Sequence, residues 1–353
     1  MHIFYTSSYD ASVYLQQPEQ NAGRDEILEV GKLYYGSIKD IARTFIKFDV
    51  SNIETGSGDY KVFLNLKSAN SEAIPLQYTI FANAVSQSWT MGTGTKFDNI
   101  TSNGISWKYR DGINSWQDNT VGGTAYYVAG TTGSANAEGG TWYILGETSQ
   151  SFDNEPDDVR IDVTDIINNW VSGSLPNNGF VIHHSLDSEN DSLDYGLLKF
   201  FSKETNTIYE PKLEVVYDDS SFDTGSLTPV VGSAEDGYKV VITNLKKEYT
   251  ADSKIQIRVK GRDMYPSKSF GTTFAYDQSK YISNMYYQLE DYITGEAVIP
   301  FDEYTKISCD STSNYFILNL NTLAKRRTYK LSNKRYHETN YLHDFKRKWK
   351  QYF

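Results

Sequence analysis

The 353-residue sequence has very little cysteine, and Cys309 is its only thiol. A single cysteine cannot form an intramolecular disulfide, so no cystine framework can support the fold. No apolar run approaches the roughly 18 residues that a membrane-spanning helix needs. The first ten residues lack the positively charged and apolar stretches of a signal peptide. These absences predict a protein that is made and assembled in the cytoplasm and contacts no membrane.

Aromatic residues are abundant, because 28 tyrosines and 17 phenylalanines help to bring their share to 14%. Tyrosine, phenylalanine, valine, isoleucine and threonine fit the half-buried surface of a β-sheet better than a helix. The 25 glycines supply the turns that short strands need. We therefore expect an all-β protein, and the length of the chain favours about two domains.

Alternating or nearly alternating apolar residues predict strands in the first 217 residues, at 42–50, 61–66, 76–82, 179–184 and 213–217. One short helix interrupts them, with Thr164 as its N-cap and Gly173 at its C-terminal stop. Its apolar face consists of Ile166, Ile167, Trp170 and Val171. The stretch 117–140 is too polar for a core element, and we expect a long loop or a hairpin insertion there.

A linker is predicted at 218–226, which is acidic, rich in small residues and without periodicity. Beyond it, 238–242, 254–259 and 315–320 alternate again. We therefore expect residues 227–330 to form a second, smaller β-sandwich domain.

The C-terminal tail, residues 331–353, lies in a strongly basic end of the chain. Residues 323–353 contain ten Lys and Arg and two acids, a net charge of +8; the whole chain is −11, which leaves −19 for the rest. The interleaved Leu342, Phe345, Trp349, Tyr352 and Phe353 have three- to four-residue spacing. That spacing predicts a helix with one apolar face.

We expect this basic amphipathic tail to dock on an acidic neighbouring subunit. The candidate contact residues are Arg326, Arg327, Lys334, Arg335, Phe345, Lys346, Arg347, Lys348 and Trp349. A solvated, partly disordered end is the alternative. Nucleic acid is a less favoured partner, because the acidic remainder of the chain repels phosphates.

Several segments of the first 217 residues occur in a distinctive order: 28–31, 43–49, 89–94, 104–109, 162–165, 178–180, 201–204 and 211–215. Together they resemble the DNRLRE-type domain, a jelly-roll module related to carbohydrate-binding modules. The resemblance implies an N-terminal jelly-roll β-sandwich over residues 1–217. Thr90 stands where that domain usually has a glutamate after its first tryptophan.

Segments of the second domain resemble tailed-phage virion proteins, namely 258–262, 265–266, 301–310, 315–316 and 326–329. With the missing cystines, this resemblance implies a non-enzymatic structural component of the virion tail, neck or baseplate. Such a subunit would be assembled in the host cytoplasm, contact other virion proteins and repeat with symmetry. The alternative is a carbohydrate-binding adhesion module that recognises a host-surface glycan.

Six tryptophans bear on that alternative. Trp89, Trp107 and Trp170 occupy motif positions of the resembled domain, which implies core packing. Trp116 and Trp142 flank the polar stretch 117–140, and we take them as the candidates for exposed rings that stack on a sugar.

Catalysis has little support in the sequence. His183 and His184 are neighbours in a predicted strand and therefore belong to opposite faces. Cys309 has no histidine nearby in sequence, and we interpret it as a small buried apolar residue. No P-loop, nucleophile elbow or metal-spaced His/Cys set occurs. We expect no enzymatic activity, and a polysaccharide-degrading enzyme ranks last.

One acidic segment is a candidate calcium site, since Asp187, Glu189, Asp191 and Asp194 lie close together in sequence. Calcium binds six to eight oxygens, and jelly-roll modules often contain a structural calcium ion. Solvated loop charge is the favoured interpretation, because no EF-hand spacing occurs. We expect no other cofactor.

Overall fold

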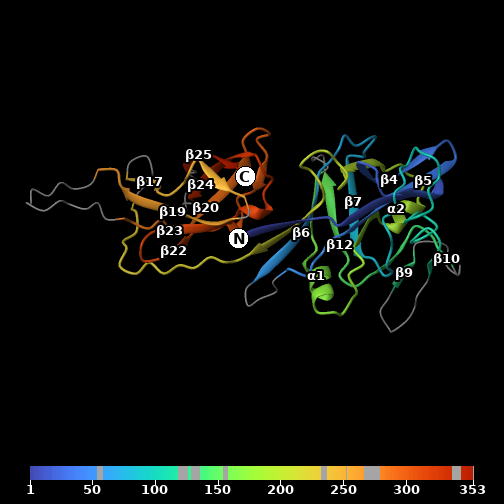
Figure 1. Cartoon of the computed structure of the whole chain (residues 1–353), viewed down its shortest axis with the longest axis horizontal. Coiled ribbons are helices and arrows are strands. Elements are labelled where there is room, and N and C mark those ends of the chain that lie inside the picture. Colours follow the sequence, from blue (N-terminus) through green and yellow to red (C-terminus); the bar gives the residue numbers. More distant parts are fainter. Residues whose placement is uncertain are drawn as a thin grey trace, which may run out of the picture. The chain divides into compact units, whose positions relative to one another are not determined.

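The computed structural model describes residues 1–53, 59–117, 126–128, 136–153, 158–231, 237–251, 253–265, 279–335 and 343–352. Within them the chain is all-β, as predicted, and it divides into two compact units (Figure 1). The N-terminal module comprises 4–56 and 61–215, and the C-terminal module comprises 1–3, 57–60 and 216–353. No helix in these described ranges is long and apolar enough to cross a membrane.

Antiparallel strands build the first 217 residues. They are β1 (His2–Thr6), β2 (Tyr9–Tyr14), β3 (Gln17–Ala22), β4 (Ile27–Tyr35), β5 (Ile38–Lys47), β6 (Tyr60–Leu66), β7 (Gln77–Ala84), β8 (Trp116–Gln117), β9 (Tyr126–Val128), β10 (Asn136–Ala137), β11 (Thr141–Tyr143), β12 (Thr148–Asp153), β13 (Val159–Asp162), β14 (Phe180–His184), β15 (Gly196–Phe201) and β16 (Lys212–Tyr217). One sheet has the order β1-β16-β6-β13. An eight-stranded sheet follows the path β12-β7-β14-β5-β2-β3, with β4 also paired to β5 and β15 paired to β4. The result is a jelly-roll-like β-sandwich, which confirms the predicted fold class.

Strand β6 shows why the alternation predicts strands correctly. Val62, Leu64 and Leu66 are fully buried, while Lys61 is exposed and Asn65 is half-buried. Burying an aliphatic side chain of this size contributes about 1.5–3 kcal/mol. The period of two therefore fixes which side of the strand faces the core.

The predicted helix is present as α1 (Thr164–Val171), with Ile166, Ile167 and Trp170 buried. Thr164 is its first residue rather than its N-cap, and its hydroxyl oxygen accepts a hydrogen bond from the Val62 amide at 3.0 Å. Val171 is exposed, so its expected place on the apolar face was wrong. A second helix, α2 (Leu186–Asn190), was not predicted, because its 5 residues are too few to show a helical spacing of apolar residues.

Asn21 on β3 connects the segments 91–94 and 104–105 to the sheet. Its amide nitrogen donates to the Met91 and Ile105 carbonyl oxygens at 2.7 and 2.8 Å, and its side-chain oxygen accepts from the Gly94 amide at 2.8 Å. A Cβ atom on Gly104 would lie 2.4 Å from the Gly92 Cα. Glycine is therefore required where these two segments meet.

We expect Asn21→Ala to lower the free energy of unfolding by about 2–3 kcal/mol, because it leaves buried backbone groups without partners. Urea unfolding followed by tryptophan fluorescence measures this loss. Asn103→Ala is the matched control, since the Asn103 amide is exposed and bonds only to Thr93. Equal stability of the two variants would contradict the role assigned to Asn21.

A buried carboxyl group on β2 is expected to make the stability depend on pH. Burial raises the pKa of Asp10 to about 7, even though its Oδ2 accepts hydrogen bonds from the Lys203 amide (2.7 Å) and the Ser7 hydroxyl (3.3 Å). Burial likewise raises the pKa of Asp25 to about 6. In the unfolded chain both groups titrate near pH 3.9, at roughly the value for a free aspartate.

Between about pH 4 and pH 7 these two aspartates bind more protons in the folded state than in the unfolded state, so their contribution to stability falls as the pH rises. The buried histidines His183 and His184 act in the opposite direction below about pH 6.5, because burial lowers their pKa. We therefore expect the midpoint of urea unfolding of the wild type, taken relative to that of Asp10→Asn, to decrease from about pH 5 to about pH 8. A wild-type profile that runs parallel to that of Asp10→Asn would contradict this prediction.

The C-terminal module is a second set of packed sheets. Its elements are β17 (Tyr238–Ile242), β18 (Glu248–Thr250), β19 (Lys254–Asp263), β20 (Met285–Asp291), β21 (Ala297–Ile299), η1 (Glu303–Thr305), β22 (Ser308–Cys309), β23 (Asn314–Asn319), η2 (Leu320–Thr322), β24 (Thr328–Arg335) and β25 (His343–Tyr352). The sheets have the orders β17-β19-β23-β22 and β18-β25-β24-β20-β21. Tyr287 of one stacks on Phe316 of the other with ring centres 4.3 Å apart, so the buried faces of both sheets form one core.

Two expectations for this half of the chain change. The segment 218–226 is not a free linker, because the Cys309 amide donates to the Ser221 carbonyl at 2.8 Å and Phe222 forms a parallel bridge with Cys309. The basic tail is not a helix over 343–352, because β25 pairs antiparallel with β24 over 343–350 and parallel with β18 over 350–352. Apolar residues whose three- to four-residue spacing predicts one face of a helix can instead belong to a strand when a neighbouring strand pairs with them.

Candidate functional site

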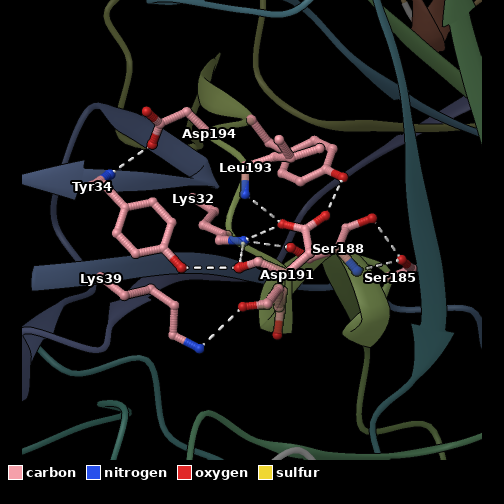
Figure 2. Close-up of polar contacts among 10 residues, drawn as sticks. Lys32, Tyr34, Lys39, Ser185, Ser188, Asp191, Leu193 and Asp194 are labelled. Carbon is pink, nitrogen blue, oxygen red and sulfur yellow. Dashed lines mark hydrogen bonds and ion pairs between the residues drawn. The ribbon is translucent and has the colours of Figure 1, made fainter. Parts of the chain in front are cut away.

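Two buried cations on adjacent strands bind the acidic segment 187–194. Lys32 on β4 has a fully buried side chain, and its Nζ donates to the Ser188 carbonyl (2.7 Å), the Asp191 carbonyl (2.7 Å) and Asp191 Oδ1 (2.6 Å). Figure 2 shows these contacts converging on the ammonium group. The rings of Tyr34 and Tyr195 lie with their centres 5.3 and 5.5 Å from Nζ, which adds cation–π attraction.

The carboxylates of this segment have protein donors as partners. Asp191 also accepts from the Tyr195 hydroxyl at 2.7 Å, and the Lys32 hydrogen bond lowers the pKa of Asp191 to about 2. Asp194 accepts from the Tyr34 amide at 2.7 Å (Figure 2). The lysine ammonium thus occupies the oxygen-lined position that a cation would need.

The structure supports neither the candidate calcium site at Asp187, Glu189, Asp191 and Asp194 nor the favoured interpretation as solvated loop charge, because Glu189 is buried. Lys32 and Arg43 neutralise two of these carboxylates, and Asp187 is exposed at the start of α2. In the part of the chain that the structure describes, no group of three or more Asp, Glu, His or Cys side chains could hold a metal ion. Spacing in sequence could not reveal that internal cations already compensate these charges.

Arg43 on β5 is the second cation. Its Nε donates to Glu189 Oε1 at 3.0 Å, its Nη2 pairs with Oε2, and its Nη1 donates to the Gly139 carbonyl at 2.9 Å. Both partners of the ion pair are almost fully buried. Burial by itself raises the pKa of Glu189, but the charge and hydrogen bonds of Arg43 bring it below its usual range.

Two tryptophan rings enclose this ion pair. The guanidinium carbon of Arg43 lies 4.6 Å from the ring centre of Trp107 and 5.1 Å from that of Trp142. Gly139 has a φ of +75°, and a Cβ there would lie 2.4 Å from Arg43 Nη1. The backbone at this position approaches the guanidinium as closely as only glycine allows.

The expected sugar-binding role of Trp116 and Trp142 is also wrong, because both are core residues with exposed fractions of 0% and 1%. Trp116 stacks on Phe45 with ring centres 5.4 Å apart, and its Nε1 donates to the Ser106 carbonyl at 3.2 Å. Trp142 lies 4.5 Å from the ring centre of His183. Most of the polar stretch between the two tryptophans, 118–125 and 129–135, lies outside the described residues.

Neither histidine of the 183–184 pair is exposed to a ligand. Burial lowers the pKa of His183 to about 4 and also lowers that of His184, so both are neutral near pH 7. His183 Nε2 lies 3.0 Å from Asn83 Oδ1. Cys309 is buried as expected, and burial raises the pKa of its thiol to about 11. A thiol with such a pKa is a poor nucleophile at neutral pH.

Seven of the nine candidate contact residues of the basic end belong to the paired strands β24 and β25 of one sheet. Arg327 Nε lies 3.3 Å from the carboxylate of the buried Asp291, and the guanidinium of Arg335 lies 5.3 Å from the ring centre of Tyr238. Lys334 Nζ lies 5.2 Å from the ring centre of Phe301. These three cations therefore also contribute to the module itself. Arg326, with a φ of +59°, precedes β24, and Phe345, Lys346, Arg347, Lys348 and Trp349 belong to β25.

Sequence reasoning missed Lys32 and Arg43 although a signal was present. Arg43 lies two positions from both Ile41 and Phe45, in the stretch 41–46 of β5 that is buried on both faces. A charged residue at such a position predicts a buried partner of opposite charge. What the sequence does not tell is which acid fills that role.

The comparisons with known proteins add no family, because no protein-family model matches the chain and no curated protein matches it either.

Proposed function

We propose that this chain is a non-enzymatic structural component of a tailed-phage virion, from the tail, neck or baseplate. It would assemble through its C-terminal module as a repeated subunit, next to other virion proteins, and display the jelly-roll-like N-terminal module. The proposal rests on the resemblances noted in the sequence and on the arrangement of charge over the two modules.

The observation that carries the proposal is that the basic end of the chain is a strand of a sheet. β25 pairs with β24 from Arg335 opposite His343 to Thr328 opposite Lys350. Every second residue of the sequence from 346 to 350 is a lysine. A basic segment that belongs to a sheet is suited to a defined contact with an acidic subunit, more than a disordered arm would be.

The N-terminal module supports a structural role over adhesion. The tryptophans proposed to stack on a sugar, Trp116 and Trp142, fill its core. The carboxylates of Glu189 and Asp191 are used in internal ion pairs. These contacts favour a rigid, stable module that serves as a building unit.

Purified virus particles from the source of this sequence test the proposal. We expect a density-gradient fraction of intact particles to contain the chain at a fixed copy number, measured by quantitative mass spectrometry. Antibody against the chain should label one region of the particle in electron micrographs. Absence of the chain from washed particles would contradict the proposal, as would its presence in variable, substoichiometric amounts.

A further inference from the structure

The sheet β17-β19-β23-β22 has one buried face and one face rich in cations. Along β19, Ile257, Val259 and Gly261 are buried. The positions between and around them are more exposed: Lys254, Gln256, Arg258, Lys260 and Arg262. Four of these five successive outward positions are basic, at a spacing of about 7 Å along the strand.

Strand β17 extends this cationic surface, because Lys239 lies directly opposite Arg262. We call Lys239, Lys254, Arg258, Lys260 and Arg262 the basic face. Within the described part of the chain, Lys239, Lys254 and Lys260 form no ion pair. Their charges are therefore available to a partner of opposite sign.

Arg258 is the anchored member of the basic face. Its Nη1 and Nη2 donate to the two carboxylate oxygens of Asp310 at 3.0 and 2.8 Å, and its guanidinium carbon lies 5.6 Å from the ring centre of Tyr315. Two aliphatic residues lie beside the cations by register, since Val241 is opposite Lys260 and Ile317 is opposite Gln256. The surface therefore combines cations with aliphatic side chains.

This mixture favours a protein partner over a nucleic acid. Single-stranded nucleic acids bind surfaces where several aromatic rings stack on successive bases. Along these strands the basic face has aliphatic neighbours and one tyrosine, Tyr315, that already contacts Arg258. Protein interfaces combine apolar side chains with complementary charges in this way.

The first 217 residues of the chain itself have a net charge of the required sign. Residues 1–217 contain 28 Asp and Glu against 14 Lys and Arg, a net charge of −14. Residues 218–353 contain 17 Asp and Glu against 20 Lys and Arg, a net charge of +3. Two copies of the chain can therefore place opposite charges against each other, which long-range electrostatic attraction favours.

We propose that the basic face docks on the acidic N-terminal module of a second copy of this chain. The inference rests on the proposed role as a repeated structural subunit and names one contact that such a subunit uses. The contact joins different surfaces of the two copies, so it closes as a reciprocal dimer or a larger ring, or it repeats as a filament.

Sedimentation velocity of the full chain over a concentration series, at low and high salt, tests this contact. We expect association that is strong at low salt and weakens as salt screens the charges. The double variant K254E/K260E should weaken association at least about tenfold, because it places acid against acid. K246E/K247E is the matched control: it changes the formal charge equally, at exposed lysines in the loop between β17 and β18, and should associate like the wild type.

Each contrary result has a definite meaning. If the wild type stays monomeric at low salt, or if both double variants weaken association equally, the proposed contact is wrong. Binding of a labelled single-stranded oligonucleotide that only K254E/K260E abolishes, without salt-dependent self-association, would replace the protein partner by a nucleic acid. Particles that contain the chain, together with unchanged association of K254E/K260E, would leave the proposed function standing and overturn this contact alone. Thermal unfolding of each variant verifies that it is folded.

Discussion

Glu189→Ala is expected to lower the free energy of unfolding of the N-terminal module by about 3–5 kcal/mol. The substitution removes the only carboxylate that pairs with the Arg43 guanidinium among the described residues. Trp107 and Trp142 enclose that guanidinium, so water cannot easily replace the lost partner. Urea unfolding followed by tryptophan fluorescence measures the loss.

Two further variants show whether the ion pair causes the effect. Asp187→Ala removes an exposed acid from the same helix, α2, and should change stability by less than about 0.5 kcal/mol. The double variant Arg43→Met with Glu189→Leu should lose less than the sum of its single changes, because no buried charge is left unpaired. Strict additivity of the two single changes would show that the pair is not coupled.

Trp116→Ala and Trp142→Ala are each expected to cost about 3–5 kcal/mol of stability, because each opens a cavity in the core that also contains Phe45 and Val181. Trp142→Ala additionally removes one of the rings over Arg43. The same urea titration detects both losses. If either residue bound a sugar, its replacement would instead leave stability nearly unchanged and abolish binding.

Phe97→Ala is the control for these core substitutions. Phe97 is 89% exposed, so its removal should change the free energy of unfolding by less than about 0.5 kcal/mol. A tryptophan variant as stable as Phe97→Ala, combined with loss of binding on a glycan array, would restore the adhesion hypothesis.

The sequence alone determined the fold class and eight of the strands, β5, β6, β7, β14, β16, β17, β19 and β23. In segments such as 61–66 and 254–259, apolar and polar residues alternate with a period of two. A strand places every second side chain on the same face, so this period predicts which face is buried. The helix at 164–171 was also predictable, because Ile166, Ile167 and Trp170 are spaced for one face and Gly173 follows them. These are local patterns, and neighbouring residues suffice to specify them.

Only the tertiary structure decided the roles of the side chains. The pairing of Lys32 with Asp191 joins residues 159 positions apart, and that of Arg43 with Glu189 joins residues 146 apart. No local pattern reveals such a partner, so an acidic segment resembled a calcium loop. Trp116 and Trp142 flank a polar stretch and resembled exposed rings, yet they pack in the core. The apolar residues of the basic tail have helical spacing, but pairing with β24 makes this part of the tail the strand β25. Local sequence specifies each element, whereas charge compensation and strand pairing depend on what the fold brings beside it.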